Sequence, residues 1–228
     1  MPVSKPELVA RAARSGADVI VLDLAELVAE VDRQEARANF AAALETARAG
    51  GAEVFAQVDP TALHDDLRAC ARPGLSGVVV TRAESTGEIA EVGGLLSRLE
   101  MERGIPPATF QIIPALETAR GNHAAYEIAK ASPRVAGLTL GRADLIMDLR
   151  PEPSQEIHLM QYLMQRLIII AGAVGVPPLG AWWCAPDRGL YATAENTYAA
   201  GHRGRAIGFK GAMCIADHQV APLNRAYG

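Results

Sequence analysis

Apolar runs alternate along the chain with longer segments in which apolar residues recur at helical spacing. The apolar runs predict seven strands, at Asp18–Leu24, Glu53–Val58, Gly77–Val80, Phe110–Pro114, Val135–Leu138, Leu179–Trp183 and Ala206–Phe209. The longer segments predict helices at Lys5–Ser15, Asp32–Ala49, Thr61–Ala71, Gly87–Arg103, Ala119–Ala131, Ser154–Val174, Arg188–Ala200 and Asp217–Ala226. Near-continuous apolar strands that alternate with helices are typical of a parallel sheet covered on both faces.

The number of strands points to a closed barrel. Seven parallel strands are many for a small open sheet and one fewer than an eight-stranded (β/α)8 barrel contains. Met1–Ser4 could supply the missing first strand in shortened form. The predicted fold is therefore α/β, a (β/α)8 TIM barrel with a shortened first strand. No linker, low-complexity tract or change in composition interrupts the sequence, so we expect residues 1–228 to form a single domain.

Composition narrows the range of functions. Half of the residues are hydrophobic and only 5% are aromatic, so the expected core is aliphatic. The net charge of −4 and the lack of a long basic run argue against a nucleic-acid surface. Cys70, Cys184 and Cys214 are widely spaced, which favours reduced thiols over a disulfide framework or a zinc site. With no signal peptide or membrane span in the sequence, we expect a cytoplasmic protein that binds neither nucleic acid nor membrane.

One carboxylate follows each of two consecutive predicted strands. Glu117 comes after Phe110–Pro114, Asp144 comes after Val135–Leu138, and a helix-length segment separates them. A right-handed crossover would make the two strands parallel neighbours and bring both carboxylates to one edge of the sheet. Because Mg²⁺ binds one or two carboxylates together with waters and substrate oxygens, the pair predicts a Mg²⁺ or Mn²⁺ site. Alternatively, each carboxylate could stabilise the first turn of a helix.

Further polar residues end the predicted strands, where barrel enzymes carry their active sites. Together with Glu117 and Asp144, they would form an acidic mouth; these further residues are Asp23, Glu26, Gln57, Asp59, Arg82 and Glu84. Arg82 and Arg120 could bind an anion there, although Arg120 could equally pair with Glu117. Asp23 could instead accept a hydrogen bond from a backbone amide. Glu26 is expected to face solvent or an arginine rather than a metal ion.

At these residues the sequence resembles the citrate lyase beta subunit and HpcH/HpaI aldolase family. Six segments match the family's motifs in order, namely Ser15–Leu24 ("SGADxxxLDLED"), Gln57–Pro60 ("RVNP"), Thr81–Ser85 ("PKVES"), Ala115–Gly121 ("xIETARG"), Gly141–Leu145 ("GxxDL") and Phe209–Asn224 ("GFxGKxxIHPxQVxxxN"). The resemblance implies a (β/α)8 barrel of the pyruvate/phosphoenolpyruvate superfamily. It also implies a homo-oligomer, a trimer or a multiple of one. The apolar segment Ser154–Val174 independently favours an oligomer, because it is apolar over more than one helix face.

The family's activity implies a reaction and a set of roles. The implied reaction is the Mg²⁺-dependent cleavage of a carbon–carbon bond in a small 2-oxo or 3-hydroxy acid, free or as its CoA thioester. This cleavage would pass through a metal-stabilised enolate. Glu117 and Asp144 would hold the metal ion, which is Mg²⁺ or Mn²⁺. The predicted catalytic residues are Gln57, Arg82 and Glu84. Asp23 and Arg120 are predicted to bind the substrate.

The sequence also departs from the family's motifs on the substrate side of the site. Gln57 replaces an arginine that would hold the substrate carboxylate or the enolate oxygen, and Arg82 replaces a lysine. Of the two acids in "LED", only Glu26 is kept, since Ala25 replaces the other. These changes keep a second hypothesis open, in which a weakened or inactive barrel acts as a binding or scaffold subunit. A third, thioester hydrolysis, would use the same metal.

Overall fold

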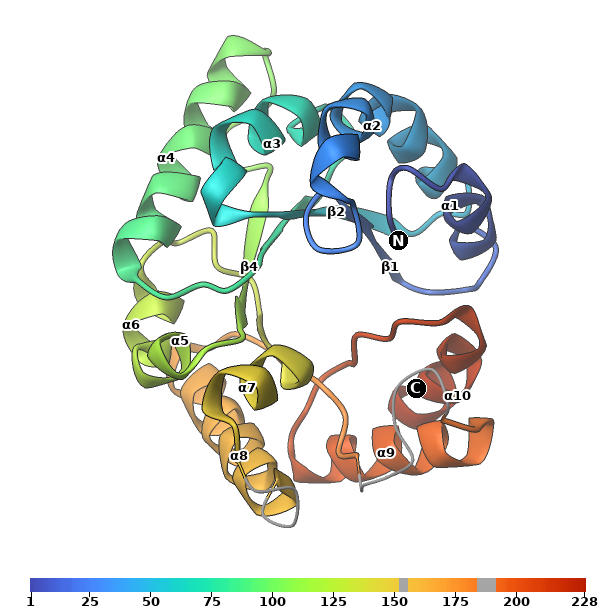
Figure 1. The fold of residues 1–228 in the computed structure, drawn as a ribbon, viewed down its shortest axis with the longest axis vertical. Coiled ribbons are helices and arrows are strands. Elements are labelled where there is room, and N and C mark those ends of the chain that lie inside the picture. The colour runs from blue at the N-terminus through green and yellow to red at the C-terminus, as the bar shows by residue number, and fades with distance from the viewer. Residues whose placement is uncertain (152–155, 184–191) are drawn as a thin grey trace.

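A parallel six-stranded sheet runs through the computed structural model of the chain, which describes residues 1–151, 156–183 and 192–228 (Figure 1). The strands are neighbours in chain order: β1 (Val19–Asp23), β2 (Glu53–Val58), β3 (Gly77–Val80), β4 (Gln111–Leu116), β5 (Leu138–Leu140) and β6 (Pro178–Leu179). Each strand pairs in parallel with the next, as expected for repeated strand–helix–strand crossovers.

Single bridging residues extend the sheet at both edges. Pro2 bridges to Asp23 beyond β1, and Gly211 bridges to Leu179 beyond β6, so eight consecutive segments follow barrel order. Within the described ranges, no bridge joins the Pro2 segment to the Gly211 segment. The fold is thus an α/β half-barrel with a curled sheet. The prediction of a closed (β/α)8 barrel is confirmed only in part, because each edge segment contributes only one bridging residue.

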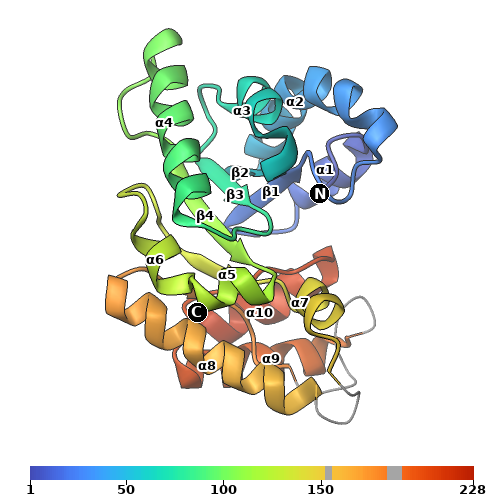
Figure 2. The same cartoon turned by 60° about the vertical axis from the view of Figure 1, so that its left-hand side comes forward.

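Helices surround the curled sheet in both views (Figures 1 and 2). Their bounds are α1 (Pro6–Ala12), α2 (Arg33–Arg48), α3 (Leu63–Cys70), α4 (Thr86–Glu102), α5 (Ala119–His123), α6 (Ala125–Lys130), α7 (Arg142–Leu149), α8 (Glu156–Val174), α9 (Ala194–Ile207) and α10 (Val220–Tyr227). Short 3-10 turns cover Glu30–Asp32, Pro60–Ala62 and Asp217–Gln219. None of the described helices is long and apolar enough to cross a membrane.

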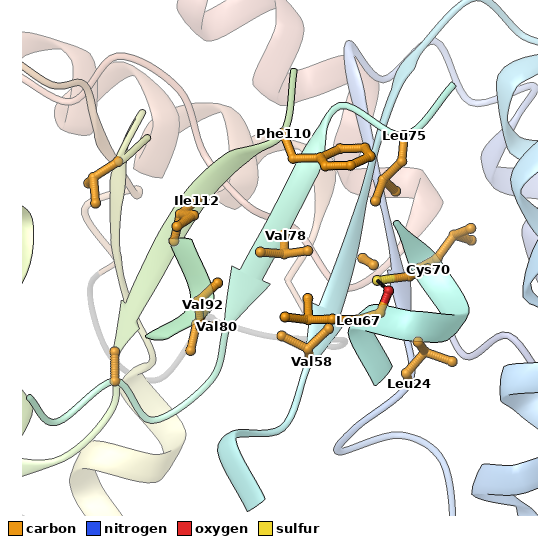
Figure 3. Close-up of a cluster of buried hydrophobic side chains, with 14 of the residues drawn as sticks. Leu24, Val58, Leu67, Cys70, Leu75, Val78, Val80, Val92, Phe110 and Ile112 are labelled. Carbon is orange, nitrogen blue, oxygen red and sulfur yellow. Dashed lines mark hydrogen bonds between the residues drawn. The ribbon is translucent and has the colours of Figure 1, made fainter. Parts of the chain in front are cut away.

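Alternate side chains of the strands build two apolar layers, because successive residues of a strand point to opposite faces. The larger layer lies between the sheet and the helices. Figure 3 shows part of it, where Val58, Val78 and Ile112 from three strands gather with Leu67 of α3 and Val92 of α4. The smaller layer is a separate cluster made of the alternate strand residues Phe55, Val79, Ile113 and Ala115, with Val21 and Leu179 packed against it.

Three of the predicted strands are placed differently in the structure. The strand predicted at Leu179–Trp183 is shorter and lies earlier, at Pro178–Leu179. The prediction of a strand at Ala206–Phe209 is wrong, because α9 continues to Ile207 and the parallel bridge forms only at Gly211. Gly208 ends α9 with a φ of 121°, a conformation that favours glycine. The strand predicted at Val135–Leu138 begins later, at Leu138, and Val135 forms only an isolated bridge to Ile112.

The helix predictions also need correction. The helix predicted at Ala119–Ala131 is two helices, α5 and α6, that meet at Ala124. Arg166 of α8 donates hydrogen bonds to the carbonyls of Asn122 and His123 at this junction, so these oxygens have a partner outside the helix. Helix α7 was not predicted. Ser154, Cys184 and Arg188, to which some predictions refer, lie outside the described residues.

Candidate metal centre

Glu117 and Asp144 follow two strands that are parallel neighbours, as the sequence predicts. In the register of β4 and β5, Leu116 lies opposite Leu140. The next residues, Glu117 and Gly141, therefore begin their loops side by side. Asp144 lies in the first turn of α7, which starts at once after this loop.

Three carboxylates meet at this edge of the sheet. Glu26, Glu117 and Asp144 each place a carboxylate oxygen within 4.8 Å of the others. Glu117 is buried, whereas Glu26 and Asp144 are exposed. The exposure of Glu26 agrees with the sequence prediction, and the predicted acidic mouth already groups Glu26 with the other two acids, but the sequence does not predict Glu26 as a member of the metal cluster. The available signal was its place three residues after Asp23, which ends β1.

Short contacts from two neighbouring loops hold Glu117. The backbone N–H of Arg82 donates a hydrogen bond to Glu117 Oε2 at 2.7 Å. On the other side, the Glu117 side chain lies against the Cα of Gly141, where a Cβ would come within 2.2 Å of Glu117 Cγ. The "GxxDL" motif includes Gly141, but the sequence indicates neither its contact with Glu117 nor the role of the Arg82 backbone. Both roles depend on how loops from different strands approach one another.

Local hydrogen bonds explain the rest of the segment that carries Glu117. Thr118 caps α5 by accepting a hydrogen bond from the Gly121 N–H at 3.1 Å. Asp148 of α7 accepts another from the Ala119 N–H at 2.6 Å. Gly121 packs so tightly against the next loop that a Cβ would lie 2.2 Å from the Ala83 carbonyl oxygen. These contacts fix the start of α5 and thereby the direction in which Glu117 leaves β4.

Crowding of negative charge perturbs the pKa of the acids. Burial is the main cause that raises the pKa of Glu117 to about 7, and the charges of Glu26 and Asp144 add to it. The hydrogen bond from the Arg82 N–H acts in the opposite direction. Desolvation of the Glu26 carboxyl group, with the charges of Asp144 and Asp23, likewise raises the pKa of Glu26. The positive charge of Arg82 opposes both rises only in part.

Asp23 holds the loop that presents Glu26. Its carboxylate is almost fully buried and accepts hydrogen bonds from the N–H groups of Ala25 at 2.6 Å and Leu27 at 3.2 Å. Burial raises the pKa of Asp23, and these backbone hydrogen bonds partly oppose that rise. The two bonds flank Glu26 and fix its backbone. The predicted role of Asp23 in substrate binding stays a prediction.

Gln57 lies at the end of β2, opposite Asp23 in the strand register. Its side-chain amide donates a hydrogen bond to Glu26 Oε2 at 3.3 Å. Gln57 therefore belongs to the acidic cluster by contact. As a neutral group it positions Glu26 without balancing its charge.

The remaining predicted site residues lie on the loops after β3 and β4. Arg82 is exposed, and its charge lowers the pKa of both Glu26 and Glu117. Arg120 Nη1 lies 3.7 Å from Glu84 Oε2, so these two residues pair with each other. The structure thus brings Glu26, Gln57 and Arg82 around the two predicted metal ligands and leaves the Glu84–Arg120 pair at the side.

The donor set suits a hard divalent cation. Carboxylate oxygens are the ligands that Mg²⁺ and Mn²⁺ prefer, and no histidine or cysteine joins the described cluster. The Glu117 carboxylate is buried and has two acidic neighbours, which raise its pKa. A cation that neutralises the three carboxylates would stabilise them. The space beside Gly141 leaves Glu117 room to point at its neighbours. The residues at the strand ends therefore fit a Mg²⁺-type ion.

Comparison with known proteins gives a consistent result over nearly the whole chain. The sequence model of the HpcH/HpaI aldolase/citrate lyase family matches residues 1–216. The citrate lyase subunit beta-like protein of Deinococcus radiodurans is 31% identical over 236 residues, which span all of this chain and 78% of that protein. An L-malyl-CoA/beta-methylmalyl-CoA lyase of Cereibacter sphaeroides is 26% identical over 250 residues, 99% of this chain and 76% of that one.

A solved structure supports the fold independently. The crystal structure of a citrate lyase from Burkholderia xenovorans superimposes with a TM-score of 0.81, at 18% sequence identity. The match covers 97% of this chain and 72% of the other. At this level of identity, the similarity concerns the fold alone.

Proposed function

The chain belongs to the HpcH/HpaI aldolase/citrate lyase family, and on that premise we propose that it is a Mg²⁺-dependent carbon–carbon lyase. Its substrate would be a small 2-oxo or 3-hydroxy acid, free or as its CoA thioester. Relatives that are a citrate lyase subunit beta and an L-malyl-CoA/beta-methylmalyl-CoA lyase support the aldolase-type reaction class. The observation that carries the proposal is the meeting of Glu26, Glu117 and Asp144 at the strand ends.

Each residue of the cluster would have a distinct role. Glu117 and Asp144 would hold Mg²⁺ or Mn²⁺ directly, and Glu26 would complete the set through its own carboxylate or through a water. When bound, the ion supplies Lewis acidity that stabilises the negative charge developing on the substrate oxygen during cleavage. Gln57 would hold Glu26 in place, and Arg82 would add positive charge at the same edge.

A direct assay tests the proposal. We expect the wild-type protein with saturating Mg²⁺ to release a 2-oxo acid or glyoxylate from citryl-, citramalyl- or malyl-type thioesters. Glu117→Ala should abolish this activity, because the cluster would lose its buried ligand. Glu91→Ala is the matched control, since Glu91 is an exposed glutamate that contacts only His64 in the described structure. Equal activity of Glu117→Ala and wild type would contradict the metal-dependent reaction.

Gln57 favours a second candidate function, a barrel with weak or no chemistry that serves as a binding or scaffold subunit. The Gln57 amide contacts Glu26 but brings no positive charge to the site. An additional cation near a developing negative charge typically raises rates by about 10²–10³. Gln57→Arg should therefore increase turnover if the site is an active lyase. A wild type and a Gln57→Arg variant that both turn over no such substrate with Mg²⁺ would favour the scaffold function.

A further inference from the structure

Arg82 has a backbone conformation that is unusual for its residue type. Its φ is 47°, in the left-handed region that L-residues other than glycine rarely adopt. Its neighbours are fixed on both sides. The N–H and the hydroxyl of Thr81 both donate to the Val58 carbonyl at 3.2 Å, and the Ala83 N–H donates to the Ala115 carbonyl at 3.1 Å. The turn between β3 and α4 therefore imposes this conformation on Arg82.

The conformation directs the Arg82 N–H at Glu117, but that alone does not require an arginine. A glycine would offer the same N–H without steric conflict at positive φ. Residues held in such strained conformations cluster at active sites and ligand-binding loops. The presence of arginine here points to a role for the guanidinium group.

The Arg82 guanidinium is available for a ligand. It is exposed and makes no hydrogen bond or ion pair with any residue that the structure describes. Two other arginines, which lie in the first turns of α5 and α7, are engaged, since Arg120 pairs with Glu84 at 3.7 Å and Arg142 pairs with Glu156 at 2.8 Å. The charge of Arg82 nevertheless reaches the cluster, as its influence on Glu26 and Glu117 shows.

We propose that Arg82 binds the carboxylate of the substrate with its guanidinium group while its backbone N–H holds the metal ligand Glu117. This inference rests on the proposed function and names the residue that fixes the substrate's anionic group. A guanidinium group offers a planar pair of donors that matches a carboxylate, and such charge-assisted bonds are strong. One residue would thereby link the position of the substrate to the position of the metal ligand.

The test separates the side chain of Arg82 from its backbone. Arg82→Gly keeps the N–H to Glu117 and removes the guanidinium, whereas Arg82→Lys keeps a positive charge. The matched control is Arg150→Gly, because Arg150 is also an exposed arginine at positive φ, 46°, and lies at the C-terminal end of α7, whereas Asp144 lies in its first turn. Calorimetry measures the affinity of each protein for Mn²⁺ alone and then for pyruvate in the presence of saturating Mn²⁺.

We expect Arg82→Gly to bind Mn²⁺ within about three-fold of wild type and pyruvate at least about ten-fold more weakly, the loss typical of one charge-assisted contact. Arg82→Lys should keep most of the pyruvate affinity, and Arg150→Gly should match wild type for both ligands. Unchanged pyruvate binding by Arg82→Gly would overturn the inference. So would an equal loss of Mn²⁺, or a wild type that binds Mn²⁺ but not pyruvate. A wild type that binds no Mn²⁺ would instead overturn the proposed function, and this inference with it.

Discussion

The Cα of Gly141 lies directly against the side chain of Glu117. A Cβ at position 141 would come within 2.2 Å of Glu117 Cγ and 2.5 Å of Oε1, far inside van der Waals contact. The two residues follow paired strands, so neither backbone can easily move away from the other. A glycine at this position is therefore a condition for the orientation of Glu117. The orientation of Glu117 in turn determines whether the three carboxylates can meet.

Gly141→Ala should weaken Mn²⁺ binding by at least about ten-fold, because the new methyl group would displace the carboxylate of Glu117, the proposed metal ligand. Calorimetric titration of the two proteins with Mn²⁺ provides the measurement. Gly94→Ala is the control, since a Cβ at Gly94 of α4 would meet nothing within 4 Å. It should bind Mn²⁺ like wild type and be slightly more stable, as alanine favours a helix. Equal Mn²⁺ affinity in Gly141→Ala would show that Glu117 is not a ligand.

Glu117 should make the metal-free protein sensitive to pH. Its pKa of about 7 in the folded state lies above its ordinary value of 4.5, so the folded state binds this proton more tightly. The resulting stability is fully present below the unfolded pKa and is lost as the pH rises through the folded pKa. At about pH 8, Glu117→Gln should therefore melt several degrees above the metal-free wild type, and this difference should vanish near about pH 5.

Calorimetry of metal-free protein at the two pH values checks this expectation. Added Mg²⁺ should stabilise the wild type at the higher pH and leave Glu117→Gln unaffected, because the amide cannot replace the carboxylate as a ligand. Asp18→Asn serves as a control for removal of one negative charge, since Asp18 is exposed and lies before β1. A Glu117→Gln variant that melts below wild type at both pH values would contradict the crowding of negative charge at the cluster.

The sequence predicts well that Glu117 and Asp144 meet at one edge of the sheet, because their placement follows from topology alone. Consecutive strands with a helix between them become parallel neighbours, and residues that follow such strands must share an edge. This argument needs no side-chain detail, and it correctly paired the segments of Glu117 and Asp144. The boundaries of β2 (Glu53–Val58) and β3 (Gly77–Val80) also agree with the prediction, since both strands are rich in valine.

The contacts that complete the site depend on tertiary geometry that no local pattern encodes. Glu26 joins the cluster because Asp23 folds its loop back through two backbone hydrogen bonds. Gly141 matters only through the side chain of a residue on another strand. For a related reason, the sequence predicts a closed barrel where the structure shows a half-barrel. A count of apolar runs cannot distinguish a paired strand from an edge segment that makes one bridge, as at Gly211.

Helix α8 exposes large apolar side chains, and from this we expect a homo-oligomer. Tyr162 is 59% exposed and Ile169 is 70% exposed on its outer face. The last turns of α8 also line an apolar hollow of about 410 Å³ that includes Ile168 and Gly172. Apolar surface of this kind is commonly buried against another subunit.

Sedimentation at micromolar concentration should show a species larger than the monomer, and Ile169→Glu should shift it toward monomer. Gln165→Glu is the control, since Gln165 is also exposed on α8. It adds the same charge without removing apolar surface, so it should leave the oligomer intact. A monomeric wild type would refute the expectation.

A buried ion pair stabilises the opposite end of the sheet, where β4 begins. Arg134 donates to both carboxylate oxygens of Glu100, at 2.8 and 2.6 Å, and both side chains are almost inaccessible. The backbone N–H groups of Ala108 and Phe110 donate to the same carboxylate at 3.1 and 3.0 Å. Burial acts to raise the pKa of Glu100, but these hydrogen bonds outweigh it and lower the pKa below its ordinary value. The carboxylate thus ties α4, the loop before β4 and the segment after α6 together.

Glu100→Gln should lower the free energy of unfolding by about 3 kcal/mol near neutral pH, because Arg134 would remain buried without its counter-charge. Urea denaturation measures this value, and Glu45→Gln is the control, since Glu45 pairs with Arg48 at the surface and its loss should cost less than about 0.5 kcal/mol.

A lowered pKa in the folded state means that the contribution of Glu100 is present above its unfolded pKa and is lost as the pH falls through its folded pKa. The difference between Glu100→Gln and wild type should therefore shrink in acid. Mn²⁺ affinity should stay unchanged, because the pair lies at the far ends of the strands from Glu117. Equal stability losses in the two variants would show that the Glu100–Arg134 pair does not stabilise the start of β4.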